Sequence, residues 1–142
     1  MGRLDRYVEM RDFTRTPEPS EAGTGGGMAL RYSIQEHHAR RTHFDLRLEW
    51  DGALLSWAVT RGPSLHPTDK RLAVRTEDHP LSYLDFEGVI PEGNYGAGEV
   101  MLFDIGHWQP TEPVESGLKK GHLKFQIHGR RLTGGWHLVR MK

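Results

Sequence analysis

The chain contains no cysteine among its 142 residues. Disulfides and thiolate metal sites are therefore excluded, and a metal would need histidine, aspartate or glutamate as ligands, a donor set that suits Mn²⁺, Zn²⁺ or Fe²⁺. The sequence also lacks a run of about 18 apolar residues, the length that a membrane-spanning helix needs. Residues 1–13 lack the apolar stretch of a signal peptide. We therefore expect a cytoplasmic protein with no membrane partner.

An excess of charge of either sign is also missing. The 19 lysine and arginine residues balance 19 aspartate and glutamate residues, so the formal net charge is zero. Composition therefore does not predict a nucleic-acid partner, which would have to be attracted by a local cluster of basic residues. Histidine, in contrast, is abundant, with nine residues, several of them near carboxylates.

The composition divides the chain into an arm and one domain. Residues 1–27 include RDFTRTPEPSEAGTGGG, which is rich in Pro, Gly, Ser and Thr and has no clear periodicity. Composition alone makes this arm typical of a disordered tail. Residues 28–142 have the length of a single domain that can bury its own core.

Alternation of polar and apolar residues, the signature of β-strands, begins at Ala29. It predicts strands over 29–37, 43–50, 53–60, 71–79, 99–104, 122–128 and 135–141, with a short helical turn within 81–87. Asp51-Gly52 is a strong signal for a two-residue hairpin, and Pro80 ends the fourth strand because it cannot donate to the ladder. We predict a mainly β fold, either a sandwich or a compact closed antiparallel β-barrel of about eight strands with short helical turns.

One polar strand face has the pattern of a metal site. His43, Asp45 and Arg47 recur about 7 Å apart on one face, and His37 ends the polar face of the preceding strand. If these strands pair, two imidazoles and one carboxylate form a facial set for a divalent metal, and Arg47 lies beside it to hold a phosphate oxygen. The neighbouring His38 is the alternative ligand. The alternative without a metal is a polar strand face that is simply exposed to solvent.

A second set of polar residues lies on strand 71–79. Arg71, Arg75 and His79 alternate with apolar residues, so we expect them to share one face and to line the same lumen. His79 is then a candidate general acid or phosphate donor, with Tyr83 beside it if residues 80–85 are helical. The simpler interpretation is that His79 is a capping or core histidine and Tyr83 a core tyrosine.

The segment IPEGNYGAGE is rich in glycine. It matches neither the P-loop nor the dinucleotide-binding fingerprint. We interpret it mainly as a structural turn, with a phosphate cradle of backbone N–H groups as the alternative.

Four long segments together resemble a known family. They are HHARRTHFDLRLEWDGALLSWAVTRGPS, DKRLAVRTEDHPLSYLDFEG, IPEGNYGAG and GHLKFQIHGRRLTGGWHLVR, and RDFTRTPEP in the arm extends the similarity. The chain is similar over nearly its whole length to the 3′-phosphoesterase domain of bacterial DNA ligase D and its stand-alone relatives. The resemblance implies a manganese-dependent enzyme of nonhomologous end joining. Such an enzyme removes a terminal ribonucleoside from a primer–template end, leaving a 3′-phosphate, and then hydrolyses that phosphate.

The resemblance also implies roles for individual residues, and a DNA ligase, a polymerase or a Ku-like repair protein as partner. His37, His43 and Asp45 match the metal ligands, and Arg47 and His79 match groups that contact phosphate and stabilise the transition state. The remaining matches, expected to support the pocket, are Tyr83, Arg71, Gln35 and Arg61, together with Arg11, Asp12 and Glu18 of the arm. Because the arm carries three of them, the resemblance implies an arm that packs over the active site.

The sequence departs from the family pattern at five positions near these motifs. They are Met10, Glu36, Arg40, Phe44 and Arg61, where the family usually has Lys, Lys, a small hydroxyl residue, Tyr and Lys. None is a proposed ligand, so the departures bear on substrate preference more than on the chemistry.

Two other functions fit the same residues. A cupin-like metal oxygenase uses two histidines and a carboxylate, although the neighbouring arginines suit phosphate better than oxygen. A module that binds 3′ ends without cleaving them would also use the basic residues, among them Arg40 and Arg41, and its affinity would fall steeply with salt.

Overall fold

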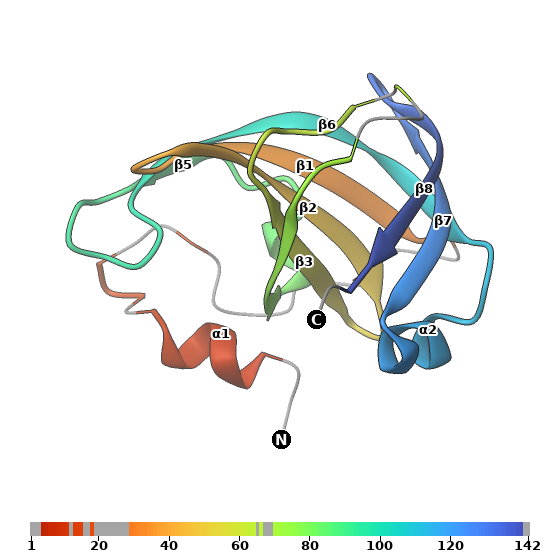
Figure 1. Ribbon diagram of the computed structural model, residues 1–142. Helices are drawn as coiled ribbons and strands as arrows, with labels where there is room; N and C mark the ends of the chain where they lie inside the picture. Colours follow the sequence, from red (N-terminus) through yellow and green to blue (C-terminus); the bar gives the residue numbers. More distant parts are fainter. Residues whose placement is uncertain are drawn as a thin grey trace.

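The computed structural model describes residues 4–11, 13–15, 18, 29–64, 66 and 70–140 (Figure 1). Its elements follow one another as α1 (Asp5–Glu9), β1 (Arg31–His38), β2 (Thr42–Trp50), β3 (Ala53–Val59), β4 (Ala73–His79), the 3₁₀ turn η1 (Leu81–Tyr83), β5 (Gly88–Ile90), β6 (Gly98–Pro110), α2 (Val114–Lys120), β7 (His122–Gly129) and β8 (Thr133–Val139). Within these residues, neither helix approaches the length and apolarity required to cross a bilayer.

The eight strands form a single antiparallel sheet that curls on itself (Figure 1). The strand order is β4-β3-β2-β1-β6-β7-β8, and the short β5 pairs with β6. The prediction of a mainly β, barrel-like fold of eight strands is therefore confirmed. Closure was overstated, because within the described strands β4 and β8 end the order without pairing with each other.

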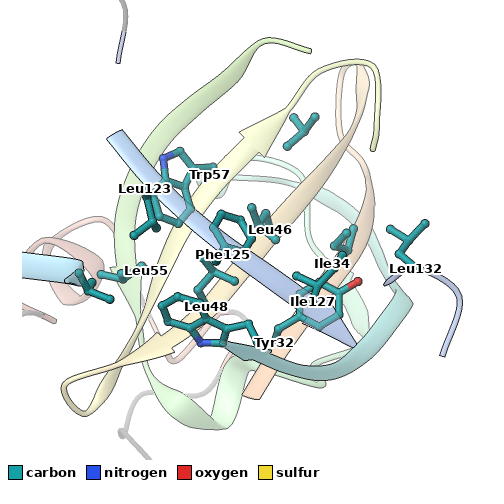
Figure 2. Packing of buried hydrophobic residues seen from close by; sticks show 13 residues of the cluster. Tyr32, Ile34, Leu46, Leu48, Leu55, Trp57, Leu123, Phe125, Ile127 and Leu132 are labelled. Atoms are coloured by element: carbon teal, nitrogen blue, oxygen red, sulfur yellow. The ribbon is translucent and has the colours of Figure 1, made fainter. Parts of the chain in front are cut away.

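Apolar side chains fill the interior of the curled sheet. Leu46 and Leu48 of β2 meet Phe125 and Ile127 of β7 there, and all four are at most 1 % exposed (Figure 2). Burying each such side chain contributes roughly 1.5–3 kcal/mol. The expected polar lumen is therefore wrong: the polar faces of β1, β2 and β3 point to the other side of the sheet.

The Asp51-Gly52 turn forms as its sequence predicts. Asp51 has a φ of 52° and Gly52 a φ of 80°, the positive values that a type I′ hairpin turn requires at both central residues. The turn pairs Trp50 with Ala53 and thereby sets the register of β2 against β3.

A register shift in β4 overturns one predicted face. Arg75 pairs with Trp57 of the apolar interior face, whereas His79 pairs with Leu54 on the opposite face, and the shift lies between Leu54 and Ser56. The guanidinium of Arg75 lies over the Trp57 ring, 4.8 Å from its centroid. Arg75 and His79 therefore do not share a face, because strict alternation fails where a bulge adds a residue.

Candidate metal centre

Strand pairing brings the three predicted ligands together. His37 of β1 lies directly opposite His43 of β2, and Asp45 follows two residues later on the same face. The Nδ1 atom of His37 is 3.3 Å from Asp45 Oδ2, and the Nε2 atom of His43 is 3.2 Å from Asp45 Oδ1. One ligand atom from each residue lies within 4.8 Å of the other two, so a single cation can reach all three.

Backbone carbonyl groups decide which histidine nitrogens face this point. His37 Nε2 donates to the Gly96 carbonyl at 2.7 Å, and His43 Nδ1 donates to the Arg41 carbonyl at 3.3 Å. A carbonyl accepts only, so these nitrogens carry protons. His37 Nδ1 and His43 Nε2 are left to face Asp45, and both would bind a metal through their lone pairs. The two ring centroids are 4.7 Å apart. One divalent metal would satisfy all three ligand atoms, and the carbonyl contacts fix the rings as in known metal sites.

Asp45 is held in its charged form. Burial alone would raise the pKa of this carboxyl, which is 6 % exposed, but the Arg47 charge and the hydrogen bonds to His37 and His43 together hold that pKa well below its usual range. A buried anion of this kind is a strong ligand for a hard or borderline cation.

Arg47 lies next to the ligands in a fixed orientation. Its Nε donates to Gln35 Oε1 at 3.0 Å, and its Nη2 is 3.6 Å from Asp45 Oδ2. The Gln35 amide in turn donates to the backbone carbonyls of Tyr83 and Phe86, at 2.9 and 3.0 Å. The guanidinium is therefore positioned before any substrate arrives.

His79 is a neutral imidazole between two guanidinium groups. Its Nδ1 donates to the Glu77 carbonyl at 2.8 Å, and its Nε2 lies 3.2 Å from Arg11 Nη2, from which it accepts. Burial and the charges of Arg47 and Arg11 hold the pKa of His79 well below its ordinary value. The ring therefore reaches the site as an uncharged group close to Arg47, whose Nη1 is 3.3 Å away.

Two described residues of the arm, Arg11 and Glu18, contact this side of the site. Arg11 donates from Nε to Glu18 and from Nη1 to Glu77, both at 2.9 Å. The Tyr83 hydroxyl also donates to Glu18, at 2.9 Å, and burial raises the pKa of that hydroxyl well above its ordinary value. The described part of the arm therefore joins η1 and β4 through charged groups that are almost fully buried.

A family model of the DNA ligase D 3′-phosphoesterase domain matches residues 35–140. The chain belongs to this family. It is 54 % identical over 142 residues to the multifunctional non-homologous end joining protein LigD of Pseudomonas aeruginosa, covering 96 % of this chain and 16 % of that protein. It is 46 % identical over 141 residues to the multifunctional non-homologous end joining DNA repair protein LigD of Mycobacterium tuberculosis, covering 97 % of this chain and 18 % of the relative. The chain thus spans less than a fifth of the length of these relatives.

Most residues that were matched to the 3′-phosphoesterase family lie in one contact network. It contains the three candidate ligands and Arg47, Gln35, His79, Tyr83, Arg11 and Glu18. His38, the alternative ligand, contacts Glu36 and Glu99 instead of Asp45. Asp12 lies outside the described residues.

The structure places the other two matched residues elsewhere. Arg71 is exposed and lines a hollow between β4 and β8, together with Arg75 and Arg140. Arg61 is exposed in the turn after β3. Any role for these two cations in the 3′-phosphoesterase reaction stays a prediction.

Three residues of the site were not among the sequence candidates. The Tyr7 ring is fully buried with its centroid 4.9 Å from that of His79, and the Arg11 guanidinium lies over it at 4.0 Å. Ser56 Oγ is 3.3 Å from His79 Nδ1, and Glu77 pairs with Arg11. The polar pattern of β4 points to Glu77, whereas nothing in the irregular arm distinguishes Tyr7.

Proposed function

We propose that the chain is a metal-dependent phosphoesterase that repairs the 3′ ends of DNA. It removes a terminal ribonucleoside from a primer–template end, leaving a 3′-phosphate, and then hydrolyses that phosphate to a 3′-hydroxyl. The observation that carries the proposal is the set of three histidine and aspartate ligand atoms with the fixed guanidinium of Arg47 beside them. The names of the relatives support a place in non-homologous end joining, with a DNA ligase, polymerase or Ku-like protein as partner.

His37, His43 and Asp45 would hold the divalent cation. A cation held there would supply charge to polarise a phosphate oxygen and would lower the pKa of a bound water. Two imidazoles and one carboxylate accept several such ions, and manganese is the ion that the family resemblance implies.

Arg47 and His79 act on the phosphate itself. Arg47 is oriented by Gln35 and Asp45 and donates to a nonbridging phosphate oxygen, where negative charge grows in the transition state. Removing one preorganised donor of this kind typically costs about a hundredfold to a thousandfold in rate. Neutral His79, held by the Glu77 carbonyl, offers a hydrogen-bonding group beside Arg47.

The family match sets aside the cupin-like oxygenase, and Arg47 supports that choice. A guanidinium 3.6 Å from a ligand carboxylate suits a phosphoryl oxygen, whereas oxygen chemistry does not need it. The end-binding module without catalysis remains the rival that experiment must decide.

A product ladder tests the proposal. Purified protein with Mn²⁺ and a 5′-labelled primer–template carrying one terminal ribonucleotide should give first a 3′-phosphate end and then a 3′-hydroxyl end. Asp45→Asn should abolish both products, whereas Glu99→Gln, at a carboxylate whose side chain is 55 % exposed, should leave them unchanged. Binding without cleavage, or full turnover in excess chelator, would refute the proposal.

A further inference from the structure

A second hollow, defined here as the mouth pocket, opens beside the metal centre. It has a volume of about 320 Å³ and lies between the α1 side of the arm and the loop that joins β5 to β6. Its walls include Glu9, Arg11 and Arg15 on one side and Gly93 and Tyr95 on the other. In Figure 1, α1 and the β5–β6 loop form one end of the molecule. This volume is at the small end of the roughly 300–1,000 Å³ found for ligand pockets.

Two contacts connect the mouth pocket to the phosphate site. Arg11 forms part of its wall, and Nη2 of the same guanidinium is 3.2 Å from His79 Nε2. Tyr95 is followed by Gly96, whose carbonyl accepts from the candidate ligand His37. A phosphate held by Arg47 therefore lies next to the opening, and a group bonded to that phosphate can enter the pocket.

The β5–β6 loop presents Tyr95 on a fixed backbone. Asn94 donates from its side chain to the Pro91 carbonyl at 3.0 Å, and Gly93 and Gly96 have φ values of 86° and 74°. Tyr95 is 48 % exposed, so its ring is accessible to a ligand. The Arg11 guanidinium is 5.3 Å from the centre of the ring. A rigidly held, accessible aromatic ring beside a guanidinium is the arrangement on which nucleobases stack.

The charges of the mouth pocket suit a neutral ligand with polar groups. Arg15 is exposed, and in the described part of the chain no hydrogen bond or ion pair engages it. Glu9 brings a carboxylate to the same wall. Arg11 is already paired with Glu18 and Glu77, so Arg15 and Glu9 are the two opposite charges offered to a ligand. Ribose hydroxyls donate to a carboxylate, and base edges accept from a guanidinium.

We propose that the mouth pocket receives the terminal nucleoside that leaves in the first reaction, with its base stacked on Tyr95. This inference rests on the proposed function. In that step the water oxygen bonds to phosphorus, the bond from phosphorus to O5′ breaks, and the nucleoside departs with a 5′-hydroxyl whose proton comes from the water. The pocket is large enough for one nucleoside but not for the duplex, which assigns it to the leaving side. The second reaction has no nucleoside on that side, so the pocket is then empty.

Comparing the rates of the two reactions therefore distinguishes an effect on the mouth pocket from an effect on the metal centre. Tyr95→Ala should slow release of a terminal ribonucleoside about tenfold or more, mainly through KM, and should leave hydrolysis of a 3′-phosphate within about twofold. Tyr95→Phe keeps the ring and should retain both rates. Val89→Ala, at an exposed position of β5 that does not line the pocket, is the matched control.

A primer whose terminal ribose lacks its base tests the stacking contact directly. Removing the base should slow the wild-type enzyme by the same factor as the Tyr95→Ala substitution slows release of a complete nucleoside. Removing the base should not slow the Tyr95→Ala variant any further. Equal slowing of both reactions by Tyr95→Ala, no slowing at all, or fully additive losses would overturn the proposal.

Binding without turnover keeps this test apart from the proposed function. In excess chelator, wild-type protein should prefer a ribonucleoside-terminated end to a 3′-phosphate end, and Tyr95→Ala should erase that preference. If wild-type protein cleaves neither end but shows the preference, the proposed function fails and the pocket assignment stands. If it cleaves both ends and shows no preference, the pocket assignment fails alone.

Discussion

Gln35 uses both ends of its side-chain amide inside the protein. Its nitrogen donates to the carbonyls of Tyr83 and Phe86, and its oxygen accepts from Arg47. The residue contacts no candidate ligand in these bonds, yet it connects the guanidinium of Arg47 to the backbone around η1. It is therefore a positioning residue, and its effect should be separable from metal binding.

Gln35→Met should lower the rate of phosphate release by about tenfold to a hundredfold, because a misplaced Arg47 weakens transition-state contacts. The affinity for Mn²⁺, measured by titration calorimetry, should stay within about twofold, since the three ligands are unchanged. Gln35→Glu, which keeps an acceptor for Arg47, should recover part of the rate. Loss of metal affinity equal to the loss of rate would show that Gln35 maintains the whole site and not Arg47 alone.

At the scale of elements, the arm is joined to β4 by one buried cation. The side chains of Glu18 and Glu77 are 0 % and 4 % exposed, and both pair with Arg11. Taking two carboxylates out of water is tolerated only while their partner is present. The arm and the strand therefore depend on each other.

Arg11→Gln should lower the free energy of unfolding by about 3–5 kcal/mol, because it leaves two buried carboxylates without their cation. Arg6→Gln, at an exposed position of α1 in the same arm, should change it by less than about 0.5 kcal/mol. Urea denaturation followed by circular dichroism measures both. Similar midpoints for the two variants would mean that the arm contributes little to stability.

The turn between β7 and β8 is organised by another buried carboxylate. Asp104 of β6 accepts from the Tyr32 hydroxyl and from the backbone N–H groups of Arg131 and Leu132. A Cβ atom at Gly129 would lie only 2.0 Å from Asp104 Oδ2, so the carboxylate needs glycine there. Burial opposes the charge, but these donors outweigh it and lower the pKa of Asp104.

This shift predicts a pH dependence of stability. Because the folded pKa lies below the unfolded value of about 3.9, the contribution is complete above that value and is lost as the pH falls through the folded pKa. Asp104→Asn should cost about 1–3 kcal/mol at pH 7, and the difference from wild type should shrink below about pH 4. Denaturation at several pH values measures it. A difference that stays constant down to pH 2 would contradict the assignment.

The same elements show what the sequence can predict. Alternation in 43–50 and the Asp51-Gly52 turn are local signals, and they predict β2, the hairpin and the shared face of His43, Asp45 and Arg47. The separation of Arg71 and Arg75 from His79 depends on a register shift between β3 and β4, which arises only when the strands pair. Tyr7 is likewise buried by β4 and η1, not by any pattern in the arm, so its place was not predictable.

For the whole molecule, alternation identifies two faces but not which one turns inward. The sheet curls around the face that carries Leu46, Leu48 and Phe125, because burying this face removes more apolar area from water than burying the polar face would. The face that carries the candidate ligands is left outside the curl, where Tyr7 of α1, η1 and the β5–β6 loop contact its residues. A polar lumen was therefore the wrong expectation even though the ligand set was brought together.

This arrangement should couple metal binding at the candidate centre to the stability of the molecule. All three candidate ligands come from β1 and β2, which lie in the middle of the strand order, so unfolding the sheet disperses them. A cation that binds only the folded state stabilises it by about 2.7 kcal/mol at a hundred times its Kd. For a chain of this length, that corresponds to a rise in Tm of roughly 8–10 °C.

Wild-type protein stripped with chelator should therefore show that rise when Mn²⁺ is added, in a thermal scan that needs no substrate. Asp45→Asn removes the only carboxylate of the ligand set and should abolish most of the rise. Glu99→Gln should retain it, because this exposed carboxylate contacts His38 and not the ligands. An equal rise in Tm for wild type and Asp45→Asn would mean that the cation binds at another site. The catalytic site would then have to be sought there as well.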